Sequence, residues 1–149
     1  MMKASLRILV VCGLALGVIG AGMASAAKAP TTTYAGKKDG VKARIVAGDQ
    51  AIRFFRVSAL SVCDSGYRER GPYKWGHRPN EYPVKFDSRG HFSFRQVNPD
   101  NNYIAVFRGR RTTSGINGIY GYRSNVFDEC FTGKSFRDFH VRFATHPTG

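Results

Sequence analysis

Leucine is scarce in this chain of 149 residues. Only five leucines occur, at Leu6, Leu9, Leu14, Leu16 and Leu60, so the chain after its N-terminal part has almost none. Helical bundles need unbranched and γ-branched apolar residues in their cores. The composition therefore argues against a helical bundle. A hydrophobic fraction of 42% also excludes a disordered chain, and the length fits one domain.

Motifs that carry chemistry are absent or incomplete. The four histidines show neither i, i+4 spacing nor cysteine partners, which argues against a zinc site. Gly133-Lys134-Ser135 begins like a nucleophile elbow, but the second glycine is missing. No glycine pattern matches a dinucleotide fingerprint. The sequence therefore predicts no catalytic residue, no metal ion and no cofactor.

The N-terminal residues have the pattern of a secretory signal. Lys3 and Arg7 precede an uncharged apolar stretch over 8–23, and Ala24-Ser25-Ala26 supplies small residues for cleavage. The stretch is shorter than the roughly 20 residues of a membrane-spanning helix, the alternative interpretation. We predict a signal peptide over 1–26 and a secreted or otherwise extracytoplasmic protein, in the periplasm or cell envelope. No later segment is apolar enough to span a membrane.

Two cysteines remain after such cleavage, Cys63 and Cys130. An even count in an exported protein most often forms a disulfide. The alternative is a reactive thiol, but acidic neighbours raise the pKa of a thiol, and Asp64, Asp128 and Glu129 flank these two. We therefore predict a Cys63–Cys130 disulfide.

Apolar and polar residues alternate with a period of two from Tyr34 onward, which is typical of half-buried antiparallel strands. The clearest alternations lie at 41–45, 92–95, 103–108, 116–122 and 138–143. The long apolar run over 52–63 changes phase near Phe54-Phe55, which indicates a central strand with a bulge. We expect one all-β domain over 34–145: a single antiparallel meander of about seven or eight strands, closing as a small barrel or sandwich. A flexible lead-in (27–33) and a short tail (146–149) flank it.

Short motifs resemble those of a family of small exported bacterial β-proteins. Tyr34-Ala35-Gly36 opens the domain, and Cys130-Phe131-Thr132-Gly133 with Val141-Arg142-Phe143-Ala144 closes it. The chain departs from that pattern by carrying seven residues between Gly133 and Val141. The resemblance implies an exported β-domain with one disulfide, and it implies no function.

A basic excess is the main indication of function. Lys and Arg number 23 against 10 Asp and Glu; removing residues 1–26 leaves 21 against 10, a net charge of +11. Such a charge attracts polyanions, and arginine suits bidentate contact with their oxygens. Several basic residues lie on expected strands, and neighbouring strands would join them into a positive face: Lys42, Arg44, Arg53, Arg56, Arg108, Arg110 and Arg142.

The segment 64–83 is expected to be one long irregular loop in which aromatic residues alternate with basic ones. Aromatic rings between cations can stack on sugars or bases; alternatively, they fold back over an open end of the barrel. The candidate ligand-binding residues are Arg70, Tyr73, Lys74, Trp75, His77 and Arg78, with Arg108 and Arg110 on a strand.

The interpretation favoured by these features is a non-catalytic domain that binds an anionic envelope polymer, an acidic polysaccharide or extracellular nucleic acid. A solvated exterior that only keeps the protein in solution is an equally simple account of the charge. A secreted ribonuclease is a further alternative, with His77, Glu81 and His140 as candidates for the acid and base. The last alternative function is a protein-binding module, such as an inhibitor or an adhesin. The sequence does not predict the oligomeric state.

Overall fold

The protein is described by a computed structural model over residues 29–76, 81–100, 102–126 and 128–149. Within these ranges the chain forms ten strands and no helix. The strands are β1 (Thr32–Lys38), β2 (Val41–Ala47), β3 (Ala51–Cys63), β4 (Arg68–Trp75), β5 (Val84–Lys85), β6 (His91–Asn98), β7 (Tyr103–Thr112), β8 (Gly115–Ser124), β9 (Cys130–Thr132) and β10 (His140–Pro147). The predicted signal peptide lies outside the described residues.

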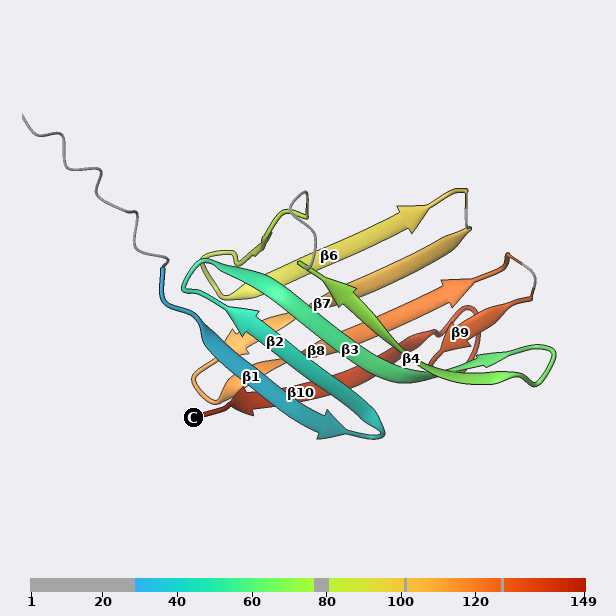
Figure 1. The fold of residues 1–149 in the computed structure, drawn as a ribbon, viewed down its shortest axis with the longest axis horizontal. Coiled ribbons are helices and arrows are strands. Elements are labelled where there is room, and N and C mark those ends of the chain that lie inside the picture. Colours follow the sequence, from blue (N-terminus) through green and yellow to red (C-terminus); the bar gives the residue numbers. More distant parts are fainter. Residues whose placement is uncertain (1–28, 77–80, 101, 127) are drawn as a thin grey trace, which may run out of the picture.

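Two antiparallel meanders make up most of the fold. Strands β1 to β4 form the first and β6 to β8 the second, each strand pairing with its neighbour in sequence. In Figure 1, β1, β2 and β3 pass in front of β7 and β8, so the meanders form two layers. Short turns that contain Gly48, Gly90 and Ser114 join or precede the strands, as expected from turn-forming residues.

Strands β9 and β10 pair with strands distant in sequence and close the two layers into a barrel. Strand β10 pairs with both β1 and β8, and β9 pairs with both β3 and β8. The ring therefore runs β1-β2-β3-β9-β8-β10 and returns to β1. This closed six-stranded antiparallel barrel, with extra strands at its sides, confirms the predicted all-β fold class.

Strand β3 is the long central strand that the sequence indicated. Its residues pair with β2 on one edge and with β4 on the other. The register shifts where Val46 pairs with Phe54 but Ala47 pairs with Ile52, which leaves Arg53 as the extra residue. This bulge confirms the predicted change of phase, and it lets both Ile52 and Phe55 be fully buried.

Stacked aromatic rings fill the space between the layers. Phe107 of β7 stacks on Phe55 of β3 at a centroid distance of 4.0 Å and on Phe143 of β10 at 4.9 Å. All three side chains are buried. Full burial of such a side chain stabilises a fold by about 1.5–3 kcal/mol. The aromatic residues thus supply the core that the scarce leucines do not.

The expectation of one irregular segment over 64–83 is wrong. Residues Arg68–Trp75 form β4, which pairs with β3 from Phe55↔Trp75 to Val62↔Arg68. Charged residues, Gly71 and Pro72 hide the alternation in this sequence. Proline in sheets is largely confined to edge strands, and β4 pairs with β3 alone among the described strands.

The ends of the domain also differ slightly from the expected bounds. Strand β1 begins at Thr32, inside the predicted lead-in, and β10 ends at Pro147, inside the predicted tail. The backbone N–H of Thr148 donates a further hydrogen bond to the Thr33 carbonyl at 2.9 Å. Thr32, Thr33, His146 and Pro147 are therefore part of the sheet. In the described part of the chain, we find no helix of the length and apolarity needed to cross a bilayer.

Candidate functional site

Basic side chains are aligned across four hydrogen-bonded strands, β6, β7, β8 and β10. The registers place Ser93, Arg108, Ile119 and Arg142 in one row across the sheet. The adjacent row is His91, Arg110, Asn117 and Ala144. Phe107 and Phe143 are buried while Arg108, Arg110 and Arg142 are exposed or half-buried, so both rows lie on the outer side of the sheet.

These rows line a shallow, open depression of about 890 Å³, which we call the basic hollow. Its lining includes six basic side chains: Lys38, His91, Arg108, Arg110, Arg142 and His146. Among the described residues that line it, none carries a carboxylate. The hollow therefore combines concave shape with one sign of charge, which focuses the field on an approaching anion.

A pair of glycines lies beneath the hollow. Gly109 of β7 and Gly118 of β8 are direct partners in the sheet. A Cβ atom added at either one would collide with the backbone of the other strand, at Asn117 O or Arg108 O. Only glycine permits this close approach of the two strands. Arg108 and Arg110, the residues on either side of Gly109, project outward from this part of β7.

The hollow has one ordered rim. Asp87 accepts hydrogen bonds from the backbone N–H of Arg89 at 2.9 Å and of His91 at 2.8 Å, and its other carboxylate oxygen lies 3.1 Å from His91 Nδ1. These bonds, the backbone bond from His91 first, lower the pKa of Asp87. Arg110 Nε donates to the Arg89 carbonyl at 3.1 Å. The turn before β6 is thereby fixed against β7, and with it the positions of His91 and Arg110.

His140 lies one row beyond Arg108 on the same side of the sheet, since it pairs with Gly121 of β8. Its pKa is lowered, first by partial burial and then by the positive charge of Arg108, with Arg123 adding to the effect and Asp138 opposing it. The charge of Arg108 thus adds to the effect of burial on His140.

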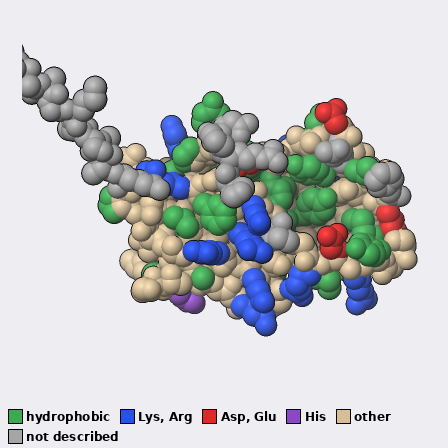
Figure 2. Space-filling view, viewed as in Figure 1, with side chains coloured by type: hydrophobic (Ala, Val, Ile, Leu, Met, Phe, Trp, Pro, Cys, Tyr) green, Lys and Arg blue, Asp and Glu red, His purple; other side chains and the backbone are tan. Residues whose placement is uncertain are grey.

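A second set of basic residues lies on the first meander. Arg44 of β2, Arg56 of β3 and Lys74 of β4 are direct cross-strand partners, and all three are exposed. We call these residues the basic row. Figure 2 shows Lys and Arg side chains gathered over this face of the molecule. The positive charge is therefore divided between two outer surfaces, and the hollow is the concave one.

The structure places the predicted ligand-binding residues in three different settings. Arg108 and Arg110 meet in the hollow. Arg70 and Lys74 lie on the outer side of β4, where Arg70 Nη1 donates to the Gly40 carbonyl. His77 and Arg78 lie outside the described residues.

The other two predicted residues, Tyr73 and Trp75, face the interior. Trp75 packs on Phe94 at a centroid distance of 4.4 Å and donates through Nε1 to the Tyr82 carbonyl at 3.0 Å. Tyr73 packs on Phe55 at 6.0 Å and donates to Gln96 Oε1. These two aromatic side chains cover the barrel core between β4 and β6, as the alternative interpretation expected, whereas Tyr67 and Tyr82 of the same segment are 62% and 83% exposed.

Sequence reasoning missed Lys38, His91 and His146 as members of the hollow. His91 lies four residues before Arg95 on the same strand, so the alternation of side chains already indicated that both point outward. What the sequence did not contain was the register that sets His91 opposite Arg110 and the meeting of β1 with β10 that brings in Lys38 and His146.

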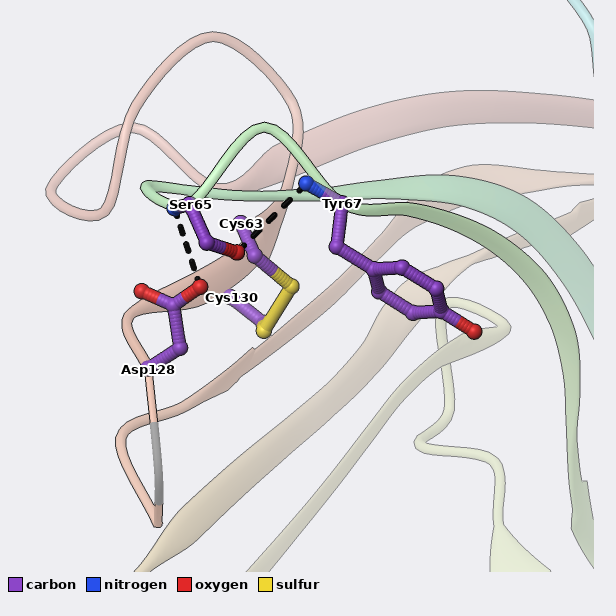
Figure 3. The surroundings of a disulfide bond; sticks show 5 residues. All are labelled: Cys63, Ser65, Tyr67, Asp128 and Cys130. Carbon is purple, nitrogen blue, oxygen red and sulfur yellow. Dashed lines mark hydrogen bonds between the residues drawn. A yellow bond between two sulfur atoms is a disulfide. The ribbon is translucent and has the colours of Figure 1, made fainter.

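The disulfide lies at the end of the barrel where β9 joins β3. Cys63 and Cys130 are direct cross-strand partners with Cα atoms 4.0 Å apart, and their sulfurs are bonded. Figure 3 shows Asp128 and Ser65 beside this bond; the Ser65 N–H donates to Asp128 Oδ2 at 3.0 Å. Hydrogen bonds from Ser65 lower the pKa of Asp128. Although Cys63, Cys130 and Asp128 cluster tightly, both sulfurs are used in the disulfide, so the cluster is not a metal site.

Comparison of the chain with protein-family models, with curated proteins and with solved structures found no match. The resemblance to small exported bacterial β-proteins therefore stays a prediction.

Proposed function

We propose that this protein is an exported, non-catalytic β-domain that binds an anionic polymer of the cell envelope or the extracellular space through the basic hollow. The observation that carries the proposal is the convergence of Arg108, Arg110 and Arg142 in one depression whose described lining has no carboxylate. Guanidinium groups make bidentate hydrogen bonds with phosphate, sulfate or carboxylate.

The hollow is favoured over the basic row for a physical reason. A concave surface of one charge keeps a bound anion close to several cations at once, whereas a flat strand surface exposes each cation separately to water and salt. Two rows of side chains across four strands also offer an extended track. Such a track suits a linear polymer better than a single small anion.

Export is supported by the disulfide. Structural disulfides persist in oxidising compartments and are rare in the cytosol, and the Cys63–Cys130 bond closes the barrel. A secreted, periplasmic or envelope location would also place the hollow among anionic polymers.

The test is binding to a sulfated polysaccharide, measured as the affinity over a series of salt concentrations. The double variant Arg108→Gln/Arg142→Gln removes two charges from the hollow, and Arg44→Gln/Arg56→Gln removes two from the basic row as a matched control. We expect the hollow variant to lose about ten-fold in affinity and the salt slope to fall by about two. The control should keep nearly the wild-type slope.

Two results would contradict this proposal. Passage of the wild-type protein over the immobilised polymer at low salt without retention would remove polyanion binding. Equal losses in the two double variants would remove the hollow as the site. RNA cleavage by the purified protein that His140→Ala abolishes would instead favour the hydrolase alternative.

A further inference from the structure

A second depression lies at the disulfide end of the barrel, between β3, β4, β8 and β9. Its volume is about 390 Å³, within the range of sites for small molecules. We call it the tyrosine cleft, because four tyrosines are among its lining residues. These are Tyr67, Tyr73, Tyr120 and Tyr122, and they share the lining with Ser61 and Glu69.

Strand β4 forms one wall of the cleft. Its acidic side chain lies on the face toward the cleft, and its basic side chains lie on the opposite face. Glu69, Gly71 and Tyr73 line the cleft, whereas Arg68, Arg70 and Lys74 alternate with them along the strand. Alternate side chains of a strand point to opposite faces, so the cations of β4 lie on the side away from the cleft. A Cβ atom added at Gly71 would lie 3.6 Å from Glu69 Oε1. The missing side chain at Gly71 therefore leaves space next to the carboxylate and Tyr73.

Tyrosines form the opposite wall and the mouth. The Tyr120 ring packs against the Tyr73 ring at the base of the cleft, with centroids 6.1 Å apart and planes inclined at 39°, and it is only 4% exposed. Burial raises the pKa of both phenols, so both stay neutral at physiological pH. Tyr67 is 62% exposed, and Figure 3 shows its ring beside the disulfide that forms part of the lining. A ligand here would meet the edges of the packed tyrosines at the base and the exposed Tyr67 ring at the mouth.

The charge of the cleft is opposite to that of the molecule. Glu69 is a carboxylate, and the described lining includes no Lys, Arg or His. Ser61 lies between Glu69 and Thr132 in the sheet register. Its hydroxyl oxygen is buried and has no hydrogen-bond partner among the described residues. A buried hydroxyl without a hydrogen-bond partner costs folding free energy unless a ligand or a water molecule supplies the missing hydrogen bond.

We propose that the tyrosine cleft binds a small methylated ammonium compound that carries a hydroxyl group, with choline as the simplest example. Tyrosine rings attract quaternary ammonium groups through cation–π interactions. Glu69 balances the positive charge, and a rotation of the Ser61 side chain would turn its buried hydroxyl toward the ligand's own hydroxyl. This site is separate from the basic hollow and takes a ligand of the opposite charge.

The test measures binding of choline and of 3,3-dimethylbutan-1-ol, its neutral carbon analogue, by NMR shifts of the tyrosine rings. We expect choline to bind about ten-fold more tightly than the neutral analogue, because both make apolar contacts with the rings but only the cation is attracted electrostatically to the rings and to Glu69. Gly71→Val fills the cleft without a steric clash at the added Cβ and should reduce choline affinity by at least about ten-fold. Glu69→Gln should reduce it about three-fold, since the carboxylate is partly screened by water.

The matched control is Glu129→Gln, which removes the same charge from an exposed residue outside the cleft lining and should leave choline affinity unchanged. Any of these results would overturn the proposal: no choline-dependent shift in the wild-type protein, equal affinity for choline and its neutral analogue, or unchanged binding in Glu69→Gln. Binding of a neutral disaccharide in place of choline would assign the cleft to sugars and overturn it as well. Because Glu69 is exposed and its replacement keeps the side-chain shape, that variant tests the proposal even if Gly71→Val does not fold.

Discussion

Arg108 acts on its neighbours as well as on the surface. Its side chain is exposed in the hollow, and its charge helps to lower the pKa of His140. The charged form of His140 is therefore less favourable in the folded protein than in the unfolded chain. Folding stability is then complete above the unfolded histidine pKa of about 6.5 and decreases as the pH falls through that value toward the lower folded pKa.

We predict that the melting temperature falls between pH 7 and pH 5 and that His140→Gln removes part of this fall. The cause is that the substituted side chain takes up no proton on unfolding. Melting curves over this pH range check the prediction. His146→Gln is the control, because His146 is exposed at the end of β10. A pH profile that is the same in the wild type and in His140→Gln would show that His140 does not contribute.

At the scale of elements, the three-residue strand β9 has an effect beyond its length. It is the strand that joins β3 to β8, and so it closes the ring of six. Its Thr132 hydroxyl donates to the Phe139 carbonyl at 2.6 Å and accepts from the Tyr122 N–H at 2.9 Å. Such a short strand has few ladder hydrogen bonds of its own, so the disulfide and Thr132 hold it in place.

We predict that the double variant Cys63→Ala/Cys130→Ala is less stable by roughly 4 kcal/mol, because the disulfide constrains a loop of 67 positions in the unfolded chain. Urea unfolding of the oxidised wild type, the reduced wild type and the variant measures the difference. A reductant should destabilise the wild type and leave the variant unchanged. Equal stability of the oxidised and reduced wild type would contradict the prediction.

At the scale of the whole molecule, the proposal of export has its own expected outcome. The N-terminal pattern predicts cleavage after Ala26, so the purified native protein should begin at Ala27. Intact mass before and after reduction checks both the new N-terminus and the disulfide. Native material that still begins at Met1 would contradict export through a cleaved signal, whereas the barrel fold would be unaffected.

The sequence predicted much of the architecture because the alternation of apolar residues is a local property. Val41, Ala43 and Ile45 are buried as their spacing indicated. The charged outer positions of β7, Arg108 and Arg110, were likewise predicted to contribute to a positive face. Strand β4 was missed because Gly71 and Pro72 interrupt its pattern, and its place was determined by pairing with β3.

The sites were less predictable because each depends on register between distant strands. The hollow requires β6, β7, β8 and β10 to align His91 with Arg110 and Arg108 with Arg142 across Ile119. The tyrosine cleft requires Tyr73 to approach Tyr120, which lies 47 positions away in sequence on another layer. No local pattern contains such distances.

The position of the Cys63–Cys130 bond has a consequence for how the protein would respond to its surroundings. The same two cysteines join the ring at its shortest strand and contribute to the lining of the tyrosine cleft. Loss of the bond would therefore loosen the barrel and one wall of the cleft together, whereas the hollow, formed by β6, β7, β8 and β10, contains neither cysteine. Under reducing conditions we therefore expect the proposed site in the tyrosine cleft to change before the basic hollow does.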